Sequence, residues 1–404
     1  MNRNNLPASP AATDEAAWAE IARHWSFAPG VTFLNHGSFG APPAEVLAAR
    51  QQLLSQLAQD PVDFMQRFLH PAMVQVRARL GPFLGADPDR LVFVENATVG
   101  MNAVACSVPL APGDEVLLTD HEYGAVSRIW QRACARAGAK MTIAQLSIPA
   151  TTADEWVEAI FAAVTKRTRL IVISHISSPT ALRLPVEQIC RAARVQGIPV
   201  CIDGPHALVS VPLDLDALDW DYYTASCHKW LLAPVGAGFL YVHPRAQPGI
   251  RSAIESWGVT WGQPPSWRDE FNWTGTRDPT SILAIPAAID FLERIGVEAF
   301  RLRSHYLAQQ ARELITAWTG LAPLSPDDTA WYASMAALPL PPGVGPPLQD
   351  ALWRRHRIEV PIFEWQGQRL VRVSCQMYTS PSDLERLLEA LKSLLATSEF
   401  RSIG

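Results

Sequence analysis

Short apolar runs that alternate with helical patterns constrain the fold of this chain more than any other feature. Helix-like segments lie between several of the runs, at 159–168 and 186–197 among others, and the second ends on the glycine expected of a helix stop. Strands that are apolar almost throughout are buried on both faces, which predicts an α/β fold with a mainly parallel, seven-stranded sheet flanked by helices. The seven predicted strands are 90–96, 114–120, 141–146, 168–176, 198–204, 222–228 and 238–243.

The regions outside this sheet divide the chain into three predicted parts. Residues 1–30 form an N-terminal extension, with a helix from Glu15 toward His24. A large domain covers 31–285, and its Trp-, Gly- and Pro-rich stretch at 251–280 is typical of a long functional loop or a dimer arm. A smaller α+β domain covers 286–404, after a helix that begins near residue 281. Its predicted elements are strands at 333–340 and 369–375 and a final helix at 382–396.

Composition excludes several classes of function. A net charge of -5 with scattered Lys and Arg residues argues against a nucleic-acid or membrane partner. The six cysteines form no C-x-x-C pair, which argues against a metal site and against a disulfide scaffold. Neither an apolar signal segment nor a run of membrane-spanning length occurs in the sequence. We therefore expect a soluble, cytoplasmic protein.

Polar residues just past the predicted strand ends define a candidate site, because ligands of parallel sheets bind at the carboxyl ends of the strands. Asp203 directly follows a buried strand, where a carboxylate is costly unless a cation meets it or unless it caps the next turn. The protonated ring nitrogen of pyridoxal phosphate is such a cation. Lys229 follows the next strand, and beside Asp203 it is suited to form a Schiff base with this aldehyde, although a lone lysine is more often a surface cation.

Three further segments fit the same hypothesis. At 95–105 a strand turns into a helix through small residues, so that the backbone N–H groups of Ala97 and Thr98 form either an anion cradle or an ordinary helix start. Tyr123 at a strand end either stacks on a planar ring or is a half-buried surface residue. Arg372 lies inside an apolar strand and needs an anion, and a substrate carboxylate bound by its fork fits.

The stretch "CIDGPHALVSVPLDLDALDWDYYTASCHKWLLAPVGAGFLYV" (201–242) resembles the active-site region of class V aminotransferase-fold enzymes. These are fold-type-I pyridoxal phosphate enzymes and include the cysteine desulfurases. "FLNHGSFGAPP", "SHISSPTALRLPV" and "FNWTGTRDPT" are most similar to the isopenicillin N epimerase-like and carbon–sulfur lyase-like branch. The resemblance covers roughly residues 30–395 and implies a cofactor-binding large domain and a homodimer with shared active sites.

The resemblance also implies roles for individual residues. Lys229 would hold the cofactor covalently and Asp203 would pair with its ring nitrogen. Tyr123 would stack on the ring, and His206 would lie near the ring hydroxyl. Arg372 would hold the substrate α-carboxylate. The implied phosphate cradle consists of Ala97, Thr98, Ser226 and His228, with Thr276 donated across a dimer interface.

This sequence departs from the desulfurase pattern in two places that bear on the reaction. Ser178 stands where desulfurases usually have Asn, so its substrate contact is an open question. The loop at 355–365 lacks their nucleophilic cysteine and has Ile362 near its place, while Cys375 is interpreted as a packed thiol. Desulfurase activity is therefore disfavoured.

The expected chemistry begins when the amine of Lys229 removes the Cα proton of an amino acid. Return of a proton to the opposite face gives an epimerase, and loss of a β-sulfur group gives a carbon–sulfur lyase; a class V aminotransferase is less favoured. A different hypothesis is a binding module without turnover, but such a module has no need of Lys229, Asp203 and Arg372 together.

His36, in "NHGSFG", is the residue expected to distinguish these reactions. It would face the substrate as an acid, a base or an orienting group, or else it is a turn histidine bonded to backbone. Four tryptophans either shape a substrate pocket or serve packing and dimer contacts. These are Trp257, Trp261, Trp267 and Trp273.

Overall fold

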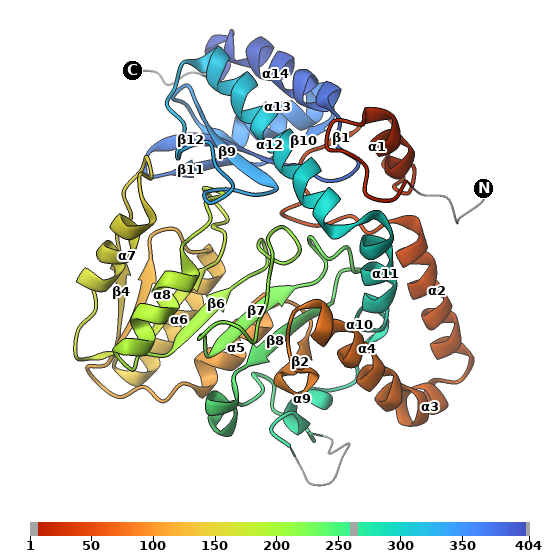
Figure 1. The fold of residues 1–404 in the computed structure, drawn as a ribbon, viewed down its shortest axis with the longest axis vertical. Helices are drawn as coiled ribbons and strands as arrows, with labels where there is room; N and C mark the ends of the chain where they lie inside the picture. Colours follow the sequence, from red (N-terminus) through yellow and green to blue (C-terminus); the bar gives the residue numbers. More distant parts are fainter. Residues whose placement is uncertain (1–6, 259–265, 401–404) are drawn as a thin grey trace.

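A seven-stranded sheet forms the centre of the molecule in the computed structural model, which describes residues 7–258 and 266–400 (Figure 1). The strand order is β2-β8-β7-β6-β5-β3-β4. The pairs of β3 with β4 and β5, of β5 with β6 and of β6 with β7 are parallel, while β8 is antiparallel to both its neighbours. The strands are β2 Leu91–Val94, β3 Glu115–Thr119, β4 Lys140–Ala144, β5 Thr168–Ser174, β6 Val200–Asp203, β7 Tyr222–Ser226 and β8 Gly238–Val242. The predicted mainly parallel sheet is confirmed.

The apolar runs form strands because both faces of the sheet are covered. Along β5, Ile171 and Ile173 belong to one core and Leu170 and Val172 to the other, all fully buried. Helices α5 and α6 contribute to the second core, and α4, α7, α8 and α11 to the first. Strand β4 lies at the edge of the sheet and is partly exposed. Because the helices cover the two faces of the sheet, the carboxyl ends of the central strands are free to form a site.

The predicted helices are present, but the one expected at 159–168 begins and ends six residues earlier, at Ala153 and Ala162. The predicted N-terminal helix, the helices between strands and the C-terminal helix correspond to α1, α7, α8, α11 and α14. The α-helices are α1 Glu15–Ala22, α2 Ala44–Gln59, α3 Pro61–Asp63, α4 Leu69–Phe83, α5 Ala97–Ser107, α6 Gly124–Ala137, α7 Ala153–Ala162, α8 Val186–Val195, α9 Asp269–Asn272, α10 Thr280–Leu283, α11 Ile285–Ile295, α12 Val297–Thr319, α13 Gly345–His356 and α14 Pro381–Leu395. A π-helical turn at Phe64–Phe68 and 3₁₀ turns at Pro88–Arg90, Pro244–Gly249 and Ser398–Phe400 complete the helical segments. In the described residues, no helix is both long and apolar enough to cross a membrane.

A second, three-stranded antiparallel sheet lies at the top of Figure 1 together with α12, α13 and α14. Its order is β11-β12-β9, with β9 at Met335–Leu340, β11 at Ile362–Trp365 and β12 at Gln368–Ser374. The short β1 (Thr32–Phe33) pairs with β10 (Ile358–Glu359), which ties the N-terminal region to this smaller unit. The predicted boundaries at residues 31 and 286 stay predictions.

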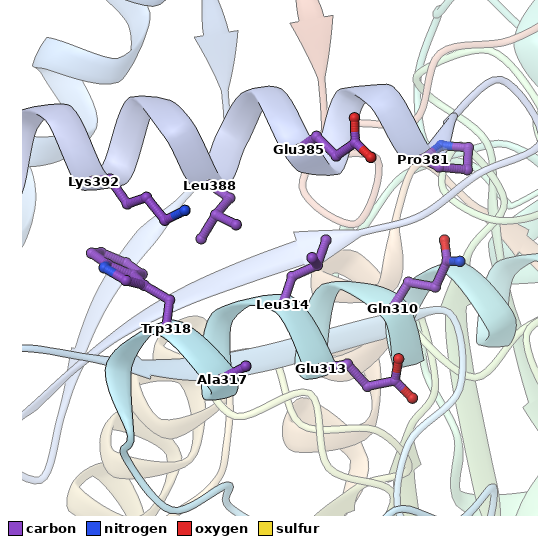
Figure 2. Close-up of a pocket in the computed structure, with 9 residues that line it drawn as sticks. All are labelled: Gln310, Glu313, Leu314, Ala317, Trp318, Pro381, Glu385, Leu388 and Lys392. Atoms are coloured by element: carbon purple, nitrogen blue, oxygen red, sulfur yellow. The ribbon is translucent and has the colours of Figure 1, made fainter.

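A groove lies between α12 and α14 of this smaller unit (Figure 2). Leu314 and Trp318 face Leu388 across it, and its volume is about 590 Å³. None of the predicted site residues lines this groove.

Candidate active site

A cavity of about 640 Å³ lies at the carboxyl ends of the parallel strands, and β11 and β12 of the smaller unit supply one of its walls. This is the position expected of a ligand site in a parallel sheet. The cavity brings together most of the predicted site residues, although their roles stay predictions. Those that line it are Ala97, Thr98, Tyr123, Ser178, Asp203, His206, Ser226, His228, Lys229 and Arg372.

Asp203 ends β6 with only 7% of its surface exposed. Within the described part of the chain, no hydrogen bond or ion pair to its carboxylate is found, and Lys229 is the charge that acts on it. Burial raises the pKa of Asp203 to about 6, and the charge of Lys229 only partly offsets that effect. A buried carboxylate that lacks a partner fits a site that receives a cation.

Lys229 follows β7 in the turn that leads to β8, and its side chain enters the same cavity. Burial and the nearby Arg372 lower the pKa of Lys229 to about 8, while Asp203 opposes the shift. The amine is therefore partly neutral near pH 8, as a nucleophile or a base must be.

His206 lies beside the lysine, with its Nε2 3.3 Å from Lys229 Nζ. Burial and the charges of Lys229 and Arg372 hold the pKa of His206 well below its usual range, so its ring is neutral. When the lysine is protonated, Nε2 accepts from it, which leaves Nδ1 as the donor, and this buried atom has no partner in the described residues. A ligand oxygen would satisfy it.

Whereas Asp203 fits a cation, the N-terminus of α5 favours an anion. The first N–H groups of a helix have no partner within the helix and favour negative charge. Ser226 Oγ accepts from the N–H of Ala97 at 3.0 Å, which fixes the helix end over β7, so this N–H is not free to bind an anion, contrary to the sequence prediction. A Cβ at Gly100 would lie 2.1 Å from Thr224 Oγ1, so only glycine permits this close approach. Sequence reasoning missed Gly100, although its place in the first turn of a helix after a strand was a usable signal.

His228 adds a further polar group to this wall. Burial is the main reason that the pKa of His228 falls to about 4, so its ring is neutral. Its Nδ1 is buried and has no partner among the described residues. Thr98 is exposed in the first helical turn and also lines the cavity. Both residues line the cavity near the N-terminus of α5, and their predicted contact with a phosphate stays a prediction.

Arg372 lies on β12 and is almost fully buried, at 1% exposure. Its Nη1 donates to the backbone oxygen of Ser178 at 2.7 Å and to Oγ of Ser178 at 3.1 Å, and its Nη2 donates to Ser38 Oγ at 3.0 Å. The guanidinium lies 4.9 Å from the ring centroid of Phe363. Burial lowers the pKa of Arg372 to about 10. Within the described ranges, all hydrogen-bond partners of this cation are neutral, so its charge is available to bind a carboxylate. Ser38 was not predicted as a site residue, although it lies in the motif "NHGSFG".

His36 does not lie where we expected it. Its ring is fully buried and does not line the cavity. Nε2 lies 3.0 Å from the backbone oxygen of Lys229, and Nδ1 lies 2.8 Å from the hydroxyl of Tyr378. Burial is the main cause that lowers the pKa of His36 to about 4. The expectation that His36 faces the substrate is therefore wrong for this structure, and the alternative of a histidine bonded to backbone describes it.

Two other expectations concern residues at the edge of the site. Tyr123 caps α6 and is 49% exposed while lining the cavity. Thr276 is exposed and does not line the cavity of its own chain. The adjacent Arg277 pairs with Glu95, two residues before α5, so the Thr276 loop is held beside the predicted phosphate cradle.

The described tryptophans of the 251–280 stretch do not line the cavity either. Trp267 and Trp273 pack against the two cores, and Trp257 is 91% exposed. The positions of Trp267 and Trp273 fit the packing alternative, whereas Trp257 neither packs in a core nor lines the cavity. Trp261 lies outside the described residues.

Five cysteines are buried and Cys106 is exposed, and none of these six described residues lines the cavity. Cys375 is fully buried, and burial raises the pKa of its thiol, as expected of a packed residue. Phe363 of β11 lines the cavity next to the position of Ile362. The described residues also contain no cluster of three or more residues able to hold a metal ion.

The chemistry of this donor set fits pyridoxal phosphate. A helix N-terminus suits the phosphate, an unpartnered buried carboxylate suits the ring nitrogen, and the amine of Lys229 suits the aldehyde. Comparison with known proteins agrees: the family model "Aminotransferase class-V" matches residues 40–387. The chain belongs to the class V aminotransferase family. The predicted resemblance is confirmed.

Sequence identities show how similar the chain is to individual members of this family. An isopenicillin N epimerase of Amycolatopsis lactamdurans is 40% identical over 94% of this chain and 98% of its own length. An L-cysteine desulfhydrase of Arabidopsis thaliana is 28% identical over 93% of this chain and 90% of its own. A solved structure of a C-DES mutant with glycine covalently linked to the PLP cofactor has a TM-score of 0.78 at 23% identity, covering 90% of this chain and 96% of that one. This protein is a pyridoxal phosphate-dependent enzyme that acts on amino acids.

Proposed function

We propose that this enzyme inverts the configuration at the Cα atom of an amino-acid group, as an epimerase. The observation that supports this most is the 40% identity to an isopenicillin N epimerase over nearly the whole of both chains, against 28% to the desulfhydrase. The cavity also has no thiol among its described lining residues, which argues against persulfide chemistry. Isopenicillin N is therefore the first substrate to test.

Substrate binding would rely on Arg372. Its guanidinium lines the cavity and already orders two serine side chains, Ser178 and Ser38, around it. An incoming α-carboxylate would accept from the guanidinium fork and could accept from these hydroxyls as well. Because the fork is planar and packed over Phe363, it would fix the orientation of Cα as well as the charge.

Proton transfer would begin at Lys229. The neutral amine, which is half populated near pH 8, would take the proton from Cα. Pyridoxal phosphate, when bound, supplies the electron sink that makes this proton acidic. The carboxylate of Asp203 would hold a proton on the ring nitrogen, and its burial keeps that interaction away from water.

Inversion requires a second proton-bearing group, because the proton must return to the face of Cα opposite to the lysine. We propose the hydroxyl of Tyr123 for this role, in addition to its predicted ring contact. Tyr123 comes from the start of α6, whereas Lys229 comes from the turn after β7, and both line one cavity. A phenol hydroxyl can donate a proton.

A second copy of the chain would complete the site. Thr276 does not line the cavity of its own chain, yet its loop is held beside α5 by the Arg277–Glu95 pair. Phe39 and Val235 line the cavity and remain 72% and 60% exposed, which is unusual for large apolar side chains unless something covers them. A homodimer in which Thr276 reaches the partner's phosphate cradle would account for both features.

The test is incubation of the loaded enzyme with isopenicillin N, and with a panel of L-amino acids, in heavy water. An epimerase produces the inverted product with deuterium at Cα, and Lys229→Ala, as the matched control, produces none. Exchange of deuterium without inversion, or no exchange at all, would refute the proposal.

Carbon–sulfur lyase activity is the second candidate, supported by the relation to the L-cysteine desulfhydrase. The same incubation with L-cysteine and cysteine conjugates distinguishes it, because a lyase releases a thiol or sulfide and pyruvate. Release that exceeds the rate of inversion would assign the enzyme to the lyase group.

A further inference from the structure

The segment Asn35–Gly40 contacts the predicted catalytic residues on both sides of the cavity. On one side it joins the smaller unit, where Asn35 forms a parallel bridge to Ser374 and Ser38 binds Arg372. On the other side it reaches the turn after β7, where His36 meets the backbone of Lys229. The segment therefore links the carboxylate-binding arginine to the lysine through a few residues.

The fit against the lysine turn is close. A Cβ at Gly40 would lie 2.4 Å from the backbone oxygen of His228 and 2.9 Å from Cα of Lys229. Real Cβ atoms do not approach other atoms this closely, so only glycine lets the segment lie directly on the backbone that carries the lysine. Any shift of this segment would be transmitted to that backbone.

The turn itself needs outside support. Leu232 has a φ of +64°, a left-handed conformation that costs a non-glycine residue about 1 kcal/mol or more. The backbone oxygen of Lys229 accepts from the N–H of Leu232 at 3.1 Å and lies 3.0 Å from Nε2 of His36. Because a carbonyl can only accept, the contact with Lys229 is a hydrogen bond when Nε2 carries the proton, and Nδ1 then accepts from Tyr378. In that tautomer the ring donates to the lysine peptide, whereas in the other one Nε2 would accept from the amide of Gln376, which lies 3.2 Å away.

We propose that His36 is a positioning residue, whose Nε2–H holds the peptide of Lys229 so that the ε-amine is presented to the cofactor. It does so without touching substrate or cofactor, since its ring is fully buried outside the cavity lining. The lowered pKa of His36, which follows mainly from burial, keeps the ring neutral and excludes it as an acid–base group near neutral pH. The inference rests on the proposed attachment of the cofactor at Lys229.

Two substitutions of similar volume separate hydrogen bonding from packing. His36→Leu fills the site but donates nothing, whereas His36→Gln keeps an amide N–H that can reach the lysine carbonyl. His305→Leu serves as the control, because His305 is a partly buried histidine that packs on Tyr332 at 4.7 Å in the smaller unit. All three variants are prepared as full chains, and their melting temperatures are measured alongside.

The first readout is the covalent attachment of pyridoxal phosphate to the cofactor-free protein, trapped with borohydride and quantified by mass spectrometry. We expect His36→Leu to attach the cofactor roughly tenfold more slowly than wild type, His36→Gln to recover most of the rate, and His305→Leu to match wild type. The second readout is steady-state kinetics, in which kcat should fall in His36→Leu while KM stays near its wild-type value, because Arg372 remains.

An attachment rate and kcat in His36→Leu equal to wild type would overturn the inference. So would equal losses in His36→Leu and His36→Gln when both melt like wild type, since the hydrogen bond would then be irrelevant. If His36→Leu does not fold, the comparison of His36→Gln with His36→Asn, whose shorter amide cannot reach the carbonyl, replaces it with the same expectations. A wild-type chain that attaches no cofactor at Lys229 would instead refute the proposed function, and this inference with it.

Discussion

Replacing Asp203 by asparagine should stabilise the cofactor-free protein while weakening its hold on the cofactor. The carboxylate is 7% exposed and, within the described part of the chain, has no hydrogen-bond donor or ion-pair partner. Asparagine has the same shape and removes the buried charge without breaking a bond that the structure contains. The substitution raises the stability of the cofactor-free protein but lowers the affinity for the cofactor, because the buried charge is favourable only when a cation is bound.

The magnitude follows from the pKa. Burial raises the pKa of Asp203 from 3.8 to about 6, so the native state binds more protons than the unfolded state between these values. Stability is therefore lost as pH rises through this window, and above pH 6 the full penalty is present. The difference between 3.8 and about 6 corresponds to at most about 3 kcal/mol. On the cofactor side, loss of a charge-assisted hydrogen bond of about 1.5–3 kcal/mol lowers affinity roughly 10- to 100-fold.

Thermal unfolding of the cofactor-free proteins at pH 4 and pH 8, with and without added pyridoxal phosphate, measures both effects. At pH 8 the variant should melt roughly a few °C higher than wild type, and at pH 4 the two should coincide. The exposed Asp290→Asn is the matched control and should not change with pH in this way. A cofactor-free Asp203→Asn protein that is less stable than wild type at pH 8, or that binds the cofactor as tightly, would refute the reasoning.

Three further outcomes follow from the site. Arg372→Leu should raise KM for the amino-acid substrate roughly 10- to 100-fold while cofactor binding is retained, and an unchanged KM would show that the carboxylate binds elsewhere. The rate of cofactor attachment should rise with pH and level off above about 8, because burial lowers the pKa of Lys229 and only the neutral amine reacts. Stopped-flow absorbance measures this rate, and a midpoint near the pKa of a free lysine would contradict the structure. Tyr123→Phe should slow inversion in heavy water at least tenfold more than it slows removal of the Cα proton, and equal slowing of both steps would remove Tyr123 as the second proton carrier.

The sheet and its site could be predicted because the relevant signals are local. Each central strand is buried on both faces, so its apolar run reads directly from the sequence, and polar residues that follow such runs must meet at one edge. Asp203 and Lys229 were predicted in this way, whereas Arg372 was predicted because a charge inside an apolar strand needs an anion. The helix α2 was not assigned, and only Val46 of its residues is buried, which leaves little apolar periodicity to detect.

The remaining features depend on contacts between distant segments. Strands β1 and β10 contain two residues each and exist only because positions 32 and 358 are brought together. The orientation of His36 was predicted wrongly for the same reason, since nothing in "NHGSFG" indicates that Lys229 and Tyr378 flank the ring. Ser38 was not predicted, because its role depends on the hydrogen bond to Arg372, which the sequence does not indicate.

Identification of the cofactor-bearing lysine tests the central claim most directly, and this chain suits the experiment because it contains only four lysines. The wild-type protein is loaded with pyridoxal phosphate, reduced with borohydride, digested and examined by tandem mass spectrometry. The account predicts a pyridoxyl group on Lys229 alone. A label on Lys140, Lys166 or Lys392, or no label, would contradict it.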